Sequence, residues 1–221
     1  TLQQYNVGVR GLRFNHDHHT TMAFVHLNQE NDRSFTFLRN PGADTQFKES
    51  EIDFSLLENT KLFHFGSLSL SHEPARSATT AILEYANKNG IPVSFDPNLR
   101  EALWTDLNQA KRQMEFGMKR ANIIKLSEEE MTFLTGETDP ERGINKLRLL
   151  GGQLILVTLG NQGSLFLYNE RVEKVGTMRV KAVDTTGAGD GFMGALLYQL
   201  TRESGLPNLN NLSREELTRM V

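Results

Sequence analysis

The stretch Asp184-Thr185-Thr186-Gly187-Ala188-Gly189-Asp190 places small residues and a carboxylate where the sequence becomes apolar at helical spacing. Glycines at a helix start let a ligand approach the backbone, whose free N–H groups there favour an anion such as phosphate. The G-x-x-x-x-G-K-[ST] phosphate loop is absent, and Phe192 stands where the dinucleotide-binding fingerprint requires glycine. The pattern therefore indicates an anion site of another kind.

Asp190 points to the chemistry of this site. A carboxylate beside an anion-binding turn repels phosphate unless it has a task, and the task that fits is to take a proton from a hydroxyl that attacks phosphorus. In the alternative interpretation, Gly187 and Gly189 only form a tight turn, and Asp190 is a helix cap or N-terminal charge. The carboxylate favours general-base catalysis of phosphoryl transfer.

Residues 184–190 resemble the C-terminal signature of the ribokinase-like (PfkB) carbohydrate kinases. The resemblance implies ATP and Mg²⁺ as cofactors. It also implies that Gly187, Ala188 and Gly189 form an anion hole for the transferred phosphoryl group. Asp190 is then the general base and contacts the hydroxyl of the substrate.

Two motifs bear on cation binding. The resemblance implies that Asp184 and the carbonyl of Thr186 bind a monovalent cation such as K⁺; the alternative is a turn-capping aspartate and an ordinary threonine. Ser127 and Glu130 lie three apart at a helix start, which is the pattern of a capping box. By resemblance, Glu130 helps to organise Mg²⁺ and water around the phosphates, and Ser127 replaces the asparagine common in the family.

A Gly-x-x-Gly turn follows an apolar strand in "VTLGNQGS". On its own this pattern is typical of a hairpin. The resemblance implies that the turn lines the phosphates and ribose of ATP, with the contacts made by Thr158, Gly160, Asn161 and Gly163.

The segment "SFDPNLREALW" places polar residues directly after a strand, at the edge where open parallel sheets bind ligands. The alternative is an ordinary Asp-Pro-Asn turn followed by a solvated arginine. "FDPNLR" is similar to a segment of fructokinases and 2-keto-3-deoxygluconate kinases. This implies that Asp96, Asn98 and Arg100 lie near substrate and phosphate.

Alternating strands and helices position these residues. Two alternating segments near residues 20–28 and 34–39 predict a β-hairpin, and from residue 61 onward short apolar runs alternate with amphipathic stretches. Strands are predicted at 61–68, 91–95, 122–126, 153–159, 164–168, 171–175 and 178–183. Helices are predicted at about 78–89, 105–121, 128–135 and 140–150, and again from about 188.

Repeated β–α alternation predicts an α/β fold with a mostly parallel sheet covered on both faces. The resemblance refines this expectation to a ribokinase-like three-layer α/β/α core with a small β-lid, formed by residues 20–44, that closes over the sugar. We expect residues 1–60 to be mainly the lid and its connections, and residues 61–221 to be the nucleotide-binding core. By resemblance, the N-terminal sugar-site strands of the family would precede Thr1, and its adenine-flanking segments would follow Val221.

The 221 residues carry a net charge of −3 and are 38% hydrophobic, which is typical of a globular chain. No basic patch or long apolar run indicates nucleic acid or a membrane as a partner. The absence of cysteine excludes disulfides and thiolate zinc sites, and cytoplasmic localisation is the default. We interpret the histidines of "HDHH" (His16, His18, His19) as a solvated cluster rather than a metal site.

The resulting hypothesis is an ATP-dependent sugar kinase, with fructose as the favoured substrate. Alternatives are a 2-keto-3-deoxygluconate or nucleoside kinase of the same fold, or a non-catalytic sugar- and nucleotide-binding module. Small molecules are the expected partners, and the resemblance suggests a homodimer formed through the lid.

Overall fold

The computed structural model describes residues 1–27, 33–182, 184–203, 209 and 212–221. In these residues one sheet has six strands in the order β3-β4-β5-β6-β7-β8. Strands β3 to β6 are parallel, and β7 and β8 continue the sheet in antiparallel pairs. The strands are β3 (Phe63–Gly66), β4 (Val93–Asp96), β5 (Ile123–Ser127), β6 (Leu154–Thr158), β7 (Ser164–Tyr168) and β8 (Arg171–Val175).

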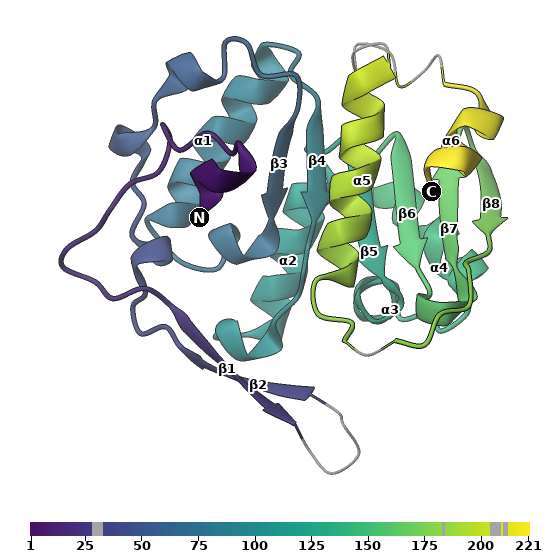
Figure 1. The fold of residues 1–221 in the computed structure, drawn as a ribbon, viewed down its shortest axis with the longest axis horizontal. Coiled ribbons are helices and arrows are strands. Elements are labelled where there is room, and N and C mark those ends of the chain that lie inside the picture. The colour runs from purple at the N-terminus through teal and green to yellow at the C-terminus, as the bar shows by residue number, and fades with distance from the viewer. Residues whose placement is uncertain (28–32, 183, 204–208, 210–211) are drawn as a thin grey trace.

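Helices cover both faces of this sheet (Figure 1). One apolar core packs beneath α1 (Ala75–Lys88), α2 (Leu107–Met118), α3 (Glu128–Thr135) and α4 (Pro140–Leu147). A second core lies on the opposite face, beneath α5 (Ala188–Glu203) and α6 (Arg214–Met220). The predicted three-layer α/β/α arrangement with a mostly parallel sheet is confirmed.

Local sequence signals explain where several helices start and end. Asp106 and Asp139 cap α2 and α4 with side-chain hydrogen bonds, and Ser127 caps α3. Helix α3 ends at Gly136, which adopts a left-handed conformation. Among the described helices, none is both long and apolar enough to cross a membrane.

The predicted hairpin is formed by β1 (Met22–Leu27) and β2 (Arg33–Leu38), paired antiparallel in the register Phe24 with Thr36. It projects from the side of the molecule where the parallel strands end and α5 begins (Figure 1). The residues that join its strands lie outside the described part of the chain. Short 3₁₀ turns lie at Leu2–Tyr5, Ala43–Thr45, Glu49–Glu51, Phe54–Leu56, Ser67–Leu70, Glu101–Leu103, Arg148–Leu150 and Gly160–Gln162.

The strand predicted at 178–183 is wrong over residues 178–182, and residue 183 lies outside the described part. The segment has no strand structure after β8, and Met178 and Val180 are 85% and 78% exposed. Alternation of apolar and basic residues indicated a half-buried strand. A strand also requires a paired neighbour and a core to cover one of its faces, and neither reaches this segment.

Candidate active site

Polar side chains replace the apolar core on one face of β3, β4 and β5. In β4, Val93 and Phe95 point into the core beneath α1 and α2. Because side chains alternate along a strand, Ser94 and Asp96 point to the opposite face, where α5 lies. His64 is opposite Ser94 in the parallel register, and its Nδ1 lies 2.9 Å from the Ser94 hydroxyl.

A buried ion pair continues this polar face onto β5. Lys125 Nζ donates to Asp96 Oδ2 at 3.0 Å, and both side chains are at least 93% buried. Asp96 Oδ1 is also buried and accepts no hydrogen bond from the described residues. A buried carboxylate oxygen without a donor is costly, which makes Asp96 Oδ1 an acceptor available to a ligand hydroxyl.

The start of α5 lies directly above Lys125. Gly187 has φ +77°, a conformation that favours glycine, and its carbonyl accepts the amide of Gly191. A Cβ at position 189 would lie 2.7 Å from Lys125 Nζ, so only glycine fits there without displacing the ammonium group. The chain therefore brings a fixed positive charge close to the N-terminus of α5, which itself favours anions.

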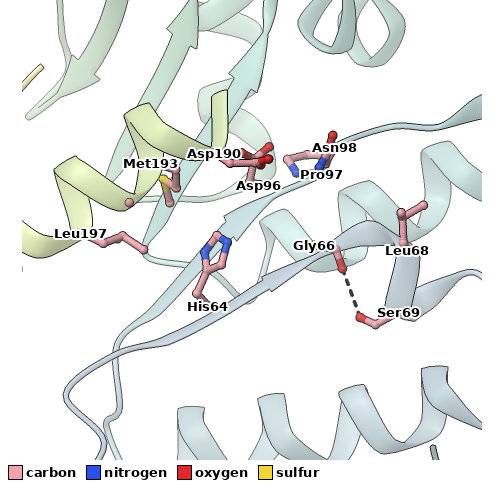
Figure 2. A pocket seen from close by; sticks show the side chains of 11 residues that line it. His64, Gly66, Leu68, Ser69, Asp96, Pro97, Asn98, Asp190, Met193 and Leu197 are labelled. Atoms are coloured by element: carbon pink, nitrogen blue, oxygen red, sulfur yellow. Dashed lines mark hydrogen bonds between the residues drawn. The ribbon is translucent and has the colours of Figure 1, made fainter. Parts of the chain in front are cut away.

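A pocket of about 380 Å³ lies between this polar face and α5. His64, Asp96, Asn98 and Asp190 supply its polar side chains. Figure 2 shows the carboxylates of Asp190 and Asp96 near each other, with the His64 ring extending from β3. We call this space the acceptor pocket, because it combines hydrogen-bonding groups with the carboxylate of Asp190.

A second pocket of about 320 Å³ lies on the other side of the α5 N-terminus. Its lining includes glycines from the β6–β7 turn and from the α5 turn, which expose backbone to the space. The full lining is Thr158, Gly160, Gly163, Ser164, Gly176, Thr177, Ala188, Gly189, Phe192 and Val221. We call it the glycine pocket.

Helical geometry separates the two pockets. Asp190, Met193, Gly194 and Leu197 lie at positions i, i+3, i+4 and i+7, so they share one face of α5, and all line the acceptor pocket. Ala188, Gly189 and Phe192 line the glycine pocket. The first turn of α5 is therefore the boundary across which a group could pass from one pocket to the other.

Burial changes the acid–base properties of His64. Desolvation lowers the pKa of His64, and the neighbouring carboxylates of Asp96 and Asp190 oppose this shift only in part. The imidazole is therefore neutral at neutral pH. It can exchange hydrogen bonds with a hydroxyl without adding charge to the acceptor pocket.

Ser127 and Glu130 form the predicted capping box, but the carboxylate of Glu130 also bonds outside it. Glu130 Oε2 accepts the amide of Ser127 at 2.8 Å, and Oε1 accepts the amide of Leu99 at 2.6 Å. Desolvation raises the pKa of Glu130, although both of these hydrogen bonds oppose the increase. Glu130 thus links α3 to the loop that follows β4.

Other predicted site residues lie outside the two pockets. Asn161 is exposed in the 3₁₀ turn after β6, and Arg100 donates to the carbonyl of Leu99 rather than lining the acceptor pocket. Asp184 Oδ1 accepts the amide of Thr186 at 2.7 Å in an exposed Asx turn. This hydrogen bond is the one expected if Asp184 caps the turn.

One backbone amide of the turn predicted as an anion hole already donates a hydrogen bond within the turn. The amide of Ala188 donates to the carbonyl of Thr185 at 3.1 Å. Gly187 and Gly189 therefore remain the residues of the turn that best fit the predicted anion contact.

Within the described part of the chain, no three His, Asp or Glu side chains gather into a group that could hold a metal ion. Residues lining the glycine pocket fit a phosphate chain, because glycines let it approach the backbone closely.

Sequence reasoning missed His64 and Lys125. Both interrupt apolar strands, in "FHFG" and "IIKLS", at positions out of phase with Phe65, Ile124 and Leu126, which belong to the core beneath α1 to α4. Counting with a period of two would have placed them on the face opposite the core, together with Ser94 and Asp96. Their pairing partners come from neighbouring strands and were not visible in the sequence.

Comparisons with known proteins agree with the fold and identify the family. A family profile described as pfkB family carbohydrate kinase matches residues 1–219. The chain is 40% identical over 218 residues to a protein named probable fructokinase-6, chloroplastic, from Arabidopsis thaliana, covering 98% of this chain and 57% of that protein. Coverage of a second Arabidopsis thaliana relative is 64%, so the chain spans about three-fifths of the length of these curated relatives.

Solved structures with the same fold include sugar and riboside kinases. Fructokinase from Vibrio cholerae O395, in a form with fructose, ADP and calcium ion bound, superposes with a TM-score of 0.87 at 33% identity, covering 99% of this chain and 69% of that one. Aminoimidazole riboside kinase from Salmonella enterica gives a TM-score of 0.83 at 30% identity, with the same coverage of both chains.

Proposed function

Because the chain belongs to the PfkB family of carbohydrate kinases, we propose that it acts as an ATP-dependent sugar kinase that phosphorylates fructose. The observation that carries this proposal is the position of the α5 N-terminus between the acceptor pocket and the glycine pocket. A sugar in the first pocket and the phosphates of ATP in the second would meet at Asp190 and the Gly187–Gly189 turn. Fructokinases among the relatives and solved structures support fructose as the acceptor.

Asp190 takes the role of general base in this proposal. Its carboxylate lines the acceptor pocket, where it accepts the proton of a primary hydroxyl as the hydroxyl oxygen attacks the γ-phosphorus. Bond formation to that oxygen accompanies cleavage of the bond to the β-phosphate, and ADP leaves through the glycine pocket. The helix N-terminus and the amides of Gly187 and Gly189 stabilise charge on the transferred group.

Nucleotide contacts are assigned to Thr158, Gly160 and Gly163, which line the glycine pocket, and to Asn161, an exposed residue of the same turn. Mg²⁺, when bound with ATP, neutralises phosphate charge. Both Glu130 oxygens already accept backbone amides, so we assign Mg²⁺ to the phosphates rather than to Glu130. Asp184 and the Thr186 carbonyl remain the proposed monovalent-cation ligands.

Acceptor contacts are assigned to Asp96 and Asn98. Asp96 Oδ1 accepts a sugar hydroxyl, and the amide group of Asn98 contacts another. Arg100 lies on the same loop and is proposed to offset phosphate charge. We also propose cytoplasmic localisation, which fits a chain without cysteine.

The general-base assignment is tested with Asp190→Asn in the full-length protein. We expect ATP binding to persist and turnover with fructose to fall at least about a hundredfold, because the amide cannot accept the hydroxyl proton. Calorimetry measures ATP binding, and sugar-dependent ADP release measures turnover. The matched control is Glu141→Gln, the same type of change in the exposed first turn of α4. Near-normal turnover of Asp190→Asn would rule out the assignment.

Aminoimidazole riboside kinase among the similar structures favours a riboside as the second candidate acceptor. A panel of fructose, 2-keto-3-deoxygluconate and ribosides, assayed by ADP release, separates these substrates. Sugar and ATP binding without any phosphorylated product would instead favour a non-catalytic binding module.

A further inference from the structure

The loop that follows β4 is fastened on both sides. On one side, the amide and hydroxyl of Ser67 both donate to the carbonyl of Pro97, at 3.0 and 2.5 Å. On the other side, Glu130 Oε1 accepts the amide of Leu99 at 2.6 Å. Ser67 follows β3 and Glu130 belongs to α3, so two different elements hold alternate residues of one short loop.

Asn98 lies between these two attachment points in a left-handed conformation, with φ +49°. Such a conformation is unfavourable for a residue with a Cβ, and asparagine tolerates it better than most. Hydrogen bonds at Pro97 and Leu99 stabilise the conformation. Asn98 and Asp96, the last residue of β4, both line the acceptor pocket, so the shape of the loop fixes Asn98 next to Asp96.

Capping of α3 accounts for only half of the hydrogen bonding of Glu130. A capping box requires one carboxylate oxygen to accept the amide of Ser127, and Oε2 does so. The second oxygen reaches another element, and the residue is only 7% exposed. Its neighbour Glu129 carries the same charge on the same helical turn, is exposed, and does not make this connection.

We propose that Glu130 is a positioning residue for the sugar, acting through Leu99 to hold Asn98 beside Asp96 in the acceptor pocket. This inference rests on the proposed sugar kinase function. It differs from the role toward Mg²⁺ that the family resemblance implied, and the two roles predict different kinetics.

Glu130→Gln in the full-length protein separates the two roles. Glutamine has the same size but only one acceptor atom, so it cannot accept both amides. We expect the KM for fructose to rise about tenfold or more, since a hydrogen bond to a charged group is lost. The apparent constant for Mg²⁺, the KM for ATP and kcat are expected to stay within about threefold. Glu129→Gln is the matched control and is expected to leave all four quantities unchanged.

Hydrogen exchange gives a readout that does not depend on activity. The amide of Leu99 is expected to exchange at least about tenfold faster in Glu130→Gln than in Glu129→Gln. Ser67→Ala loosens the loop from the opposite side, and we expect it to raise the KM for fructose without changing the Mg²⁺ dependence. This second variant keeps the test valid should Glu130→Gln fold poorly.

Three results would overturn the inference: a raised apparent constant for Mg²⁺ with an unchanged KM for fructose, unchanged exchange at Leu99, or a lower melting temperature as the only effect. Failure of the proposed function is seen separately, as absence of fructose-dependent ADP release from the wild-type protein.

Discussion

At the scale of single residues, desolvation shifts the pKa of two side chains: His64, which lines the acceptor pocket, and Glu130, which bonds to the loop after β4. The pKa of His64 is lowered because neighbouring groups displace part of the water that would solvate the charged imidazole, although the side chain stays partly exposed. The pKa of Glu130 is raised, in the direction of the neutral acid, because burial desolvates its carboxylate. Both shifts couple the protonation of these side chains to the stability of the whole chain, because the unfolded chain titrates at ordinary pKa values.

His64 gives a pH dependence of known sign. Its folded-state pKa is lowered from 6.5, so at a pH between the two values the unfolded chain binds more protons than the folded one. Stability contributed by His64 is therefore present above pH 6.5 and is lost as the pH falls through the lowered pKa. The limit for one proton is about 1.4 kcal/mol of unfolding free energy per pH unit, and solvent screening of this partly exposed side chain keeps the effect below that limit.

Urea unfolding at several pH values tests this coupling. Acidification below pH 6.5 is expected to lower the unfolding free energy less in His64→Gln than in the wild type. The control His16→Gln changes an exposed histidine outside the acceptor pocket and is expected to leave this dependence unchanged. Identical slopes in wild type and His64→Gln would contradict the argument.

At the scale of secondary-structure elements, the strands of the sheet carry two different faces. One face of β4 and β5 is continuous core, and the other carries the buried pair of Asp96 and Lys125. The pair bridges neighbouring strands below the first turn of α5. Its removal should therefore affect both the stability of the sheet and the position of that turn.

Lys125→Met tests the energetic role of the pair. Methionine leaves the carboxylate of Asp96 buried without its cation, so we expect unfolding free energy to fall by about 3–5 kcal/mol. Adding Asp96→Asn to this variant should recover part of the loss, since the isolated charge is then removed. The control Lys174→Met changes an exposed lysine on β8 and should cost no more than about 0.5 kcal/mol. A loss below about 1 kcal/mol in Lys125→Met would show that the pair is energetically neutral.

At the scale of the whole molecule, the β1–β2 hairpin extends away from the rest of the chain (Figure 1). Several of its apolar side chains are exposed. Met22, Phe24, Val25 and Leu38 are between 45% and 53% exposed. Phe24 and Val25 point to opposite faces of the hairpin, so both faces are apolar. We propose that a second copy of the chain covers part of this surface.

Sedimentation tests this homodimer. We expect the double variant Phe24→Ser/Val25→Ser to raise the dissociation constant at least about a hundredfold, because each buried apolar side chain contributes roughly 1.5–3 kcal/mol. Leu149→Ser, which removes a 79% exposed leucine on a 3₁₀ turn after α4, is the matched control and should not change the dissociation constant. A monomeric wild-type protein at micromolar concentration would contradict the proposal.

Much of the architecture is determined by the sequence itself, because its signals are local. Apolar periodicity, capping residues and the glycine turn predicted the alternating strands and helices, the hairpin and the start of α5 within a few residues. The Asx turn at Asp184 and the capping box at Ser127 depend on atoms two or three residues apart, so they could be predicted from the sequence. Residues 178–182 were misjudged because pairing with another strand is not a local property.

Tertiary structure alone decided how these parts form a site. The bonds from Lys125 to Asp96 and from Glu130 to Leu99 join atoms about thirty residues apart, and their formation depends on the register of neighbouring strands. His64 entered the site for the same reason, and Arg100 turned to the carbonyl of Leu99. The local sequence pattern predicts which face of a strand a side chain lies on. Contacts between side chains of different strands depend on the folded chain, because residues far apart in sequence can be close in space.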